Sequence, residues 1–122
     1  MEDNIQEMYK SARKAFKVIE FWPQDKVDEM VQAVACELMK EDVRHKLGHM
    51  AVDESNIGNA EDKVNKIKNK TLGTLWDMRD AKTCGLVEED TSLGIRKYAK
   101  PIGVIANVVP CTNPESTICC LA

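Results

Sequence analysis

The sequence predicts an α/β fold in which a helical segment leads into strands, and two observations carry this prediction. Over residues 1–80 apolar side chains recur at three- and four-residue steps, which is the period of amphipathic helices. From residue 83 the pattern changes to short β-branched stretches between turn residues, which is typical of strands. The 122 residues suit about one domain. Within it, residues 1–80 are expected to be mostly helical, and residues 83–122 are expected to supply a hairpin, a strand, a turn and the start of a helix.

Three helices are expected before residue 60. The first has a single apolar stripe, made of Ile5, Met8, Ala12, Ala15, Phe16 and Ile19. Pro23 suits the first position of the second helix, where its missing N–H costs nothing. That helix has the most regular stripe in the chain: Val27, Met30, Val31, Val34, Ala35 and Leu38. A third helix is expected over residues 41–54, before the turn-forming residues 55–59, with four inward positions: Val43, Leu47, Met50 and Ala51.

A fourth helix is expected to begin near Ala60. Its inward side is formed by Val64, Ile67, Leu75 and Met78. The lysines of this segment fall mostly on the other side and are expected to be solvated: Lys63, Lys66, Lys68 and Lys70. Gly73 weakens the second half of this helix, because glycine is a poor helix former.

The strands are expected after residue 82. Residues 83–87 and 93–99 are predicted to pair as a β-hairpin, with the polar residues 88–92 as its turn. Residues 102–109 form a nearly continuous β-branched run, which suits a strand covered on both faces in a parallel sheet. Residues 110–114 read as a turn, and Thr112 and Asn113 are both suitable caps for a helix that begins at Pro114. A parallel neighbour requires a crossover of a dozen or more residues, so we expect that the fold continues beyond Ala122.

The composition excludes several classes of function. The net charge of -3 gives no electrostatic footprint for nucleic acid. The apolar run near the C-terminus is interrupted by Asn107 and Pro110, and it is shorter than the roughly 20 residues that span a bilayer. The acidic N-terminus lacks the features of a signal peptide, so a cytoplasmic location and no membrane partner are expected.

The cysteines and histidines do not predict a site. The five cysteines (Cys36, Cys84, Cys111, Cys119 and Cys120) are odd in number and have no C-x-x-C spacing, so reduced and mostly buried thiols are expected. His45 and His49 have the i, i+4 spacing of metal ligands, but Lys46 stands where a zinc-protease motif has glutamate. With no third ligand evident in the sequence, we expect a solvated helix face and no metal.

The best candidate for a ligand site is the turn at residues 108–113. In α/β proteins ligands bind where a strand ends and a helix begins, because the free N–H groups of the helix attract anions. The G-x-G-x-x-G fingerprint is absent from the sequence. From the residues alone, a ligand-binding turn and a plain structural turn both remain open.

Seven stretches, in order, resemble the N-terminal part of CoA-acylating aldehyde dehydrogenases, a group that includes the aldehyde dehydrogenase half of bifunctional aldehyde-alcohol dehydrogenases. They are ARKAF (12–16), QDKVD (24–28), MAVDES (50–55), EDKVNK (61–66), KTCG (82–85), PIGVI (101–105) and VPCTNPEST (109–117). The resemblance covers nearly the whole chain. It departs from the family pattern at Cys111, where threonine or serine is more usual, and at Asn107, where a small residue is more usual.

The resemblance implies an aldehyde dehydrogenase-like fold present only in its N-terminal part. It implies that the NAD site is lined by Val108, Val109, Pro110, Cys111, Thr112 and Asn113. It leaves two oxyanion candidates, Thr112 and Asn113, since either side chain can donate a hydrogen bond. The full enzyme would oxidise a small aldehyde to an acyl-CoA with NAD and coenzyme A, reversibly, as a homo-oligomer.

The same resemblance implies that the nucleophilic cysteine lies beyond Ala122, so the chain alone is expected to be inactive. One alternative is a truncated helical module that binds a protein partner without catalysis. Such a module should melt cooperatively, whereas a fragment should be molten or aggregated. A second alternative, a thiol protein using Cys119 and Cys120, has no other support in the sequence.

Overall fold

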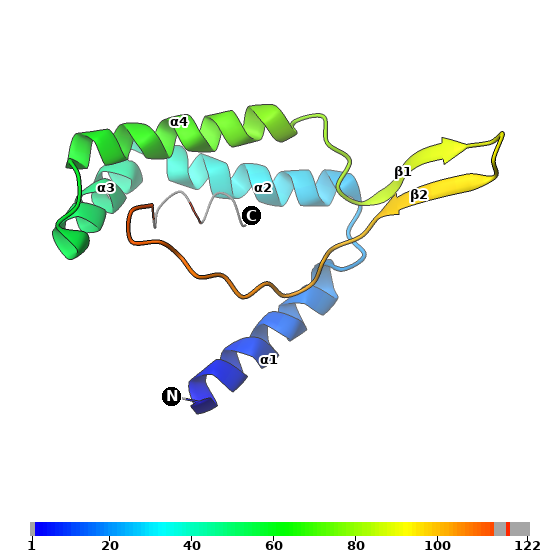
Figure 1. Ribbon diagram of the computed structural model, residues 1–122, viewed down its shortest axis with the longest axis horizontal. Helices are drawn as coiled ribbons and strands as arrows, with labels where there is room; N and C mark the ends of the chain where they lie inside the picture. Colours follow the sequence, from blue (N-terminus) through cyan, green and yellow to red (C-terminus); the bar gives the residue numbers. More distant parts are fainter. Residues whose placement is uncertain (1, 114–116, 118–122) are drawn as a thin grey trace. The chain divides into compact units, whose positions relative to one another are not determined.

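The computed structural model describes residues 2–113 and 117. In this part of the chain it contains four helices and one antiparallel two-stranded sheet (Figure 1). The elements are α1 (Glu2–Ile19), α2 (Gln24–Met39), α3 (Glu41–Ser55), α4 (Ala60–Met78), β1 (Gly85–Asp90) and β2 (Ile95–Ala99). The helix predicted to begin at Pro114 lies outside the described residues, apart from Thr117. None of the described helices is long and apolar enough to span a membrane.

The chain divides into two compact units. Residues 1–27 and 81–107 form the first, which holds α1, the beginning of α2 and the hairpin. Residues 28–80 and 108–122 form the second, which holds the rest of α2, both α3 and α4, and the turn at residues 110–113.

In the first unit, the predicted stripe of α1 lies largely on the surface. Ile5 is 63% exposed and Met8 is 65% exposed. Amphipathic periodicity predicts the helix correctly, but it buries a stripe only where another element packs against it. Pro23 precedes α2 as expected, and its carbonyl accepts hydrogen bonds from the N–H groups of Lys26 and Val27 at 3.1 and 3.2 Å.

The hairpin forms where the sequence predicts it, but its turn is shorter. Residues 88–90, predicted as turn, continue β1, because Glu88 faces Lys97 and Glu89 faces Arg96 across the two strands. Both pairs form ion pairs at 2.6 Å. A register shift between Leu86 and Glu88 marks a β-bulge. The acidic residues thus act as strand partners, which charge-based turn prediction does not anticipate.

The turn of the hairpin is organised by Asp90. Its Oδ1 accepts hydrogen bonds from the N–H of Ser92 (2.9 Å), the hydroxyl of Ser92 (2.6 Å) and the N–H of Leu93 (3.0 Å). Gly94 follows with a φ of 67°, a conformation that glycine adopts without strain. The hydroxyl of Ser92, followed by the two N–H groups, holds the pKa of Asp90 below its ordinary value.

The strand predicted over residues 102–109 is not formed. These residues have no regular secondary structure, and several of their side chains are exposed, among them Ile102 and Val108. A strand exists only through hydrogen bonds to a neighbour, and the described residues of the chain provide no parallel strand beside it. A β-branched composition is therefore not sufficient for a strand, because pairing with a neighbouring strand is a tertiary property.

In the second unit, α3 and α4 pack against each other through a close approach at Gly48. A Cβ atom on Gly48 would lie 2.6 Å from Cγ2 of Val64 and 3.1 Å from the carbonyl oxygen of Ala60, so only glycine fits without a shift. The buried apolar residues include Ala51, Val64 and Ile67, as the periodicity predicts. Met50 and Met78, predicted inward, are instead more than 40% exposed. Met78 is the last residue of α4, beyond the buried residues of this helix, which end at Thr71.

The connection between α3 and α4 is a tight turn, as predicted. Asn56 ends α3 in the left-handed conformation (φ 54°), and its N–H donates to the carbonyl of Val52 at 2.7 Å. Asn59 then caps α4, because its Oδ1 accepts hydrogen bonds from the N–H groups of Glu61 (2.9 Å) and Asp62 (3.2 Å). Gly73 does not interrupt α4.

Candidate functional site

The predicted ligand turn begins with an exposed segment. Val108 is 95% exposed and Val109 is 46% exposed, and Cys111 is also exposed. The N–H of Asn113 donates to the carbonyl of Pro110 at 3.2 Å, which closes a tight turn over residues 110–113. The structure therefore confirms a turn at this position and leaves the preceding residues accessible.

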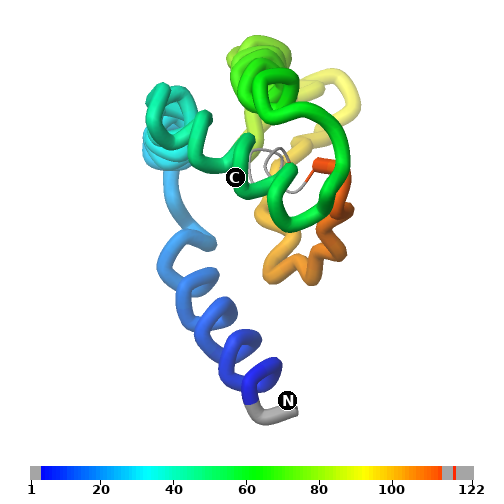
Figure 2. The backbone as a smooth tube through the Cα atoms, turned by 90° about the vertical axis from the view of Figure 1, so that its left-hand side faces the viewer, coloured from blue at the N-terminus to red at the C-terminus, as the bar shows by residue number. Residues whose placement is uncertain are grey.

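A buried lysine anchors this turn to α4 (Figure 2, orange-red segment beside the green start of α4). Lys63 is only 6% exposed, and its Nζ donates a hydrogen bond to the carbonyl oxygen of Thr112. The prediction that Lys63 belongs to a solvated face is wrong. A lysine can be buried where its ammonium group finds a polar partner, and here the partner lies 49 residues away in the sequence.

The two oxyanion candidates differ in their surroundings. Thr112 is exposed, and its backbone carbonyl accepts the hydrogen bond from Lys63. Asn113 is half-buried, and its backbone carbonyl accepts a hydrogen bond from the hydroxyl of Thr117 at 2.9 Å. Both residues thus belong to one turn with a defined backbone, and either side chain keeps its role as a candidate.

The three cysteines in the described part of the chain are free thiols, but they are less buried than predicted. Cys36 and Cys111 are exposed, and Cys84 is half-buried. Cys36 is an exposed residue of α2, and Cys111 is an exposed residue of the turn, so neither is part of a core. Cys119 and Cys120 lie outside the described residues.

One contact that sequence patterns did not reveal joins α2 to the hairpin within the first unit. The side-chain carbonyl of Gln24 accepts hydrogen bonds from the N–H groups of Thr83 (2.8 Å) and Cys84 (3.2 Å). Its amide nitrogen donates to the hydroxyl of Thr83 at 3.0 Å. A cavity of about 570 Å³ lies beside this contact, with Phe21, Trp22 and Tyr98 among its walls.

The histidine pair acquires a neighbour in the structure. The first turn of α4 brings Glu61 to the two histidines of α3, so that one possible ligand atom from each of His45, His49 and Glu61 lies within 4.8 Å of the others. The sequence contained the i, i+4 pair, but nothing in it indicated that Glu61 would lie there. The third member comes from the neighbouring helix and depends on how α3 and α4 pack.

Comparison with known proteins gives consistent results. The chain matches no family model. It is 39% identical over 113 residues to the "sulfoacetaldehyde dehydrogenase (acylating)" of Bilophila wadsworthia, a match that covers 93% of this chain and 24% of that protein. It is 40% identical over 105 residues to the bifunctional aldehyde-alcohol dehydrogenase of Escherichia coli K12, covering 86% of this chain and 12% of that protein.

A solved structure agrees with these relatives. The crystal structure of a probable aldehyde dehydrogenase from Listeria monocytogenes EGD-e superposes with a TM-score of 0.89 at 32% identity, over 96% of this chain and 25% of that one. The chain is homologous to the acylating aldehyde dehydrogenases. This result confirms the resemblance and the aldehyde dehydrogenase-like fold inferred from the sequence. The homologous chain spans about a quarter or less of the length of these proteins.

Proposed function

We propose that this chain is part of an NAD-dependent, CoA-acylating aldehyde dehydrogenase that converts a small aldehyde to an acyl-CoA, reversibly. Support comes from the homology to acylating relatives over most of the chain. When bound, NAD would supply the hydride acceptor of the reaction and coenzyme A would supply the acyl acceptor. The relatives include a sulfoacetaldehyde dehydrogenase and a bifunctional aldehyde-alcohol dehydrogenase, so the proposal specifies the substrate only as an aldehyde.

The observation that carries the cofactor assignment is the anchored turn. We assign the NAD-binding role to Val108, Val109, Pro110, Cys111, Thr112 and Asn113. Their chemistry fits a dinucleotide, because exposed valines offer apolar surface and the hydroxyl of Thr112 can donate to a polar group. The hydrogen bond from Lys63 to Thr112 holds the backbone of this turn in place.

The chain alone should be inactive. The thiolate required for covalent catalysis needs a basic or helix-N-terminal setting, and we assign that role to none of the five cysteines. The proposal also includes a cytoplasmic location and a homo-oligomeric full-length enzyme. Acyl-CoA formation by the purified chain would contradict the proposal that the chain alone is inactive.

The main test is a chimera. This chain replaces the matching segment of the Bilophila wadsworthia enzyme, which is 24% of its length, and NADH formation is followed with sulfoacetaldehyde and coenzyme A. We expect the chimera to form NADH, and we expect this activity to require both the aldehyde and coenzyme A. A folded, soluble chimera without activity, beside an active parent, would refute the proposal.

Variants of the chimera test the cofactor turn. Lys63→Met should raise the KM for NAD more than it lowers kcat, because it frees the turn without touching the reacting atoms. Lys68→Met is the matched control, since Lys68 lies exposed on the same helix. Equal effects of the two substitutions would remove the turn from the NAD site.

A non-catalytic helical module is the second candidate. It is favoured by the second unit, in which α3 and α4 bury Val64, Ile67 and Thr71. If the isolated chain is monomeric and melts cooperatively while the chimera is inactive, binding of a protein partner without catalysis replaces the enzymatic function as the proposal.

A further inference from the structure

We propose that His45, His49 and Glu61 form a binding site for a divalent transition metal such as Zn²⁺, which ties α3 to α4. The site lies wholly within the second unit. It does not depend on the enzymatic proposal, because none of its residues belongs to the turn assigned to NAD.

The local sequence creates the two-histidine half of the site. His45 and His49 are four residues apart, so they project from the same face of α3. Their rings lie with centroids 6.4 Å apart and planes inclined by only 23°. This i, i+4 arrangement is the one that lets one helix supply two imidazole ligands to a single metal.

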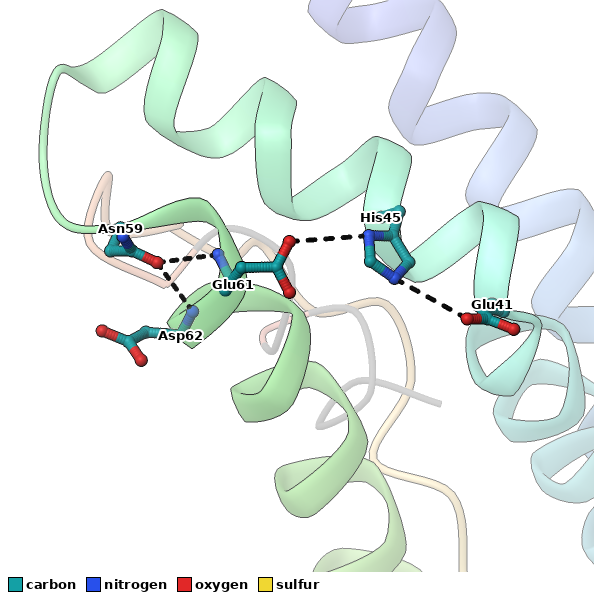
Figure 3. A network of polar contacts seen from close by, with 5 residues as sticks. All are labelled: Glu41, His45, Asn59, Glu61 and Asp62. Atoms are coloured by element: carbon teal, nitrogen blue, oxygen red, sulfur yellow. Dashed lines mark hydrogen bonds and ion pairs between the residues drawn. The ribbon is translucent and has the colours of Figure 1, made fainter.

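The packing of the helices supplies the third ligand. Gly48 lies between the two histidines in the sequence and allows α3 to approach the beginning of α4 closely. Asn59 caps α4 and fixes the first turn through the N–H groups of Glu61 and Asp62. The carboxylate of Glu61 is thereby presented to His45, as Figure 3 shows.

The distances suit a metal with little rearrangement. Oε1 of Glu61 lies 3.9 Å from Nδ1 of His45, which is too long for a hydrogen bond. Ligand atoms on tetrahedral zinc are about 3.3 Å apart, given bonds of about 2.0–2.1 Å. Because the three ligand atoms already lie within 4.8 Å of one another, side-chain movements that shorten these distances by about 1.5 Å or less close the site. The side chains of His45 and Glu61 are 41% and 66% exposed, so they have room to rotate.

A second carboxylate supports the same interpretation. Oε1 of Glu41 lies 4.0 Å from Nε2 of His45, on the opposite side of the ring from Glu61 (Figure 3). Metal-bound histidines commonly direct their other ring nitrogen to a carboxylate, which orients the ring and increases its basicity. At 4.0 Å the carboxylate of Glu41 is likewise too far for a hydrogen bond, so it would orient the ring of His45 only after a further small movement of its side chain.

The ligand set selects the class of metal. Two imidazoles and one carboxylate suit Zn²⁺, Co²⁺ or Ni²⁺, whereas Mg²⁺ and Ca²⁺ prefer oxygen ligands alone. Three protein ligands leave a fourth position on zinc for water. The exposure of the site favours binding from solution over a permanently enclosed ion.

The test uses the chain purified without a histidine tag, labelled with ¹⁵N-histidine and titrated with Zn²⁺. Because the sequence contains only 2 histidines, both sets of ring signals can be followed without ambiguity. We expect both rings to shift together up to one equivalent of metal. Loss of the shift in either ring, or no shift at all, would overturn the site.

Two variants of equal charge separate ligation from general attraction. Glu61→Gln should weaken Zn²⁺ binding by at least about tenfold, the lower limit for losing even an outer partner of a metal site. Asp62→Asn removes the same charge from the neighbouring residue and should leave the affinity nearly unchanged. Equal weakening by both would show diffuse electrostatic attraction and refute the proposal.

Thiols are the competing ligands, because Cys36 and Cys111 are exposed. Co²⁺ distinguishes them, since thiolate ligation produces an intense charge-transfer band that nitrogen and oxygen ligands lack. We expect the unmodified chain to form a Co²⁺ complex without this charge-transfer band. The His45→Gln and His49→Gln variants should not form that complex. A Co²⁺ spectrum dominated by thiolate, unchanged in both variants, would assign the metal to the cysteines and overturn the site.

Discussion

Replacing Gly48 by alanine tests the helix packing on which the second unit depends. A methyl group at this position would lie 2.6 Å from Cγ2 of Val64, and it would lie 3.1 Å from both the backbone nitrogen of Val64 and the carbonyl of Ala60. Two of these three atoms are backbone atoms at the beginning of α4, and Val64 is only 4% exposed. The neighbours therefore cannot move aside without separating the two helices.

The expected magnitude follows from two opposing contributions. Glycine to alanine inside a helix stabilises by about 1 kcal/mol through the backbone. Overpacking a closed interface costs about 1–3 kcal/mol. Gly73→Ala provides the matched control, because nothing lies within 4 Å of the added methyl group at that position on α4. We expect Gly73→Ala to raise the free energy of unfolding by about 1 kcal/mol and Gly48→Ala to leave it unchanged or lower it by up to about 2 kcal/mol.

The assay is urea unfolding followed by far-ultraviolet circular dichroism, with the urea dependence (m value) checked for constancy between variants. Amide hydrogen exchange of the first turns of α4 provides a second measurement that does not require a fully cooperative transition. If both variants raise the midpoint by the same amount, α3 and α4 do not meet at Gly48. That result would also remove the structural basis for bringing Glu61 to the histidines.

Three further predictions concern polar contacts that fix local structure. Asp90→Asn should abolish an acid-induced loosening of the hairpin turn. Because the pKa of Asp90 is lowered in the folded chain, the stabilisation that its carboxylate gives is complete above the ordinary carboxyl pKa and is lost as pH falls through the folded-state pKa. The amide signals of Ser92 and Leu93 would report this loss. Gln24→Ala should cost about 1 kcal/mol and speed amide exchange at Thr83, whereas Gln24→Glu keeps the acceptor and should protect this amide better. Asn59→Ala should destabilise α4 by about 1 kcal/mol, measured by urea unfolding, and Asn59→Asp should restore the cap; equal stability of all three forms would contradict the capping role.

The helices and the hairpin were predictable because their signals are local. The spacing of Val64 and Ile67 places both on the buried side of α4, and the structure buries both. The asparagine and glycine residues between α3 and α4 have the chemistry that a turn requires, and Asn56 takes the left-handed conformation there. In each case, residues within a few positions of one another determine the backbone conformation.

The errors concern partners far apart in the sequence. The run at residues 102–109 has strand composition but no strand, because a strand requires a hydrogen-bonded neighbour. The sequence predicts Lys63 as one of a series of solvated lysines, yet its ammonium group is buried against the carbonyl of Thr112. Periodicity reports which side of a helix a residue occupies, and it carries no information on which distant carbonyl will lie there.

By itself, the sequence determined the four helices, the hairpin, the turn after Pro110 and the relation to acylating aldehyde dehydrogenases, because each depends on local spacing or on ordered motifs. Only the tertiary structure decided that Lys63 anchors the turn and that Glu61 joins the two histidines. Both depend on long-range packing, and a contact between residues separated along the chain follows from the docking of whole elements. At Gly48, the absence of a single methyl group allows that docking to bring α3 and α4 together.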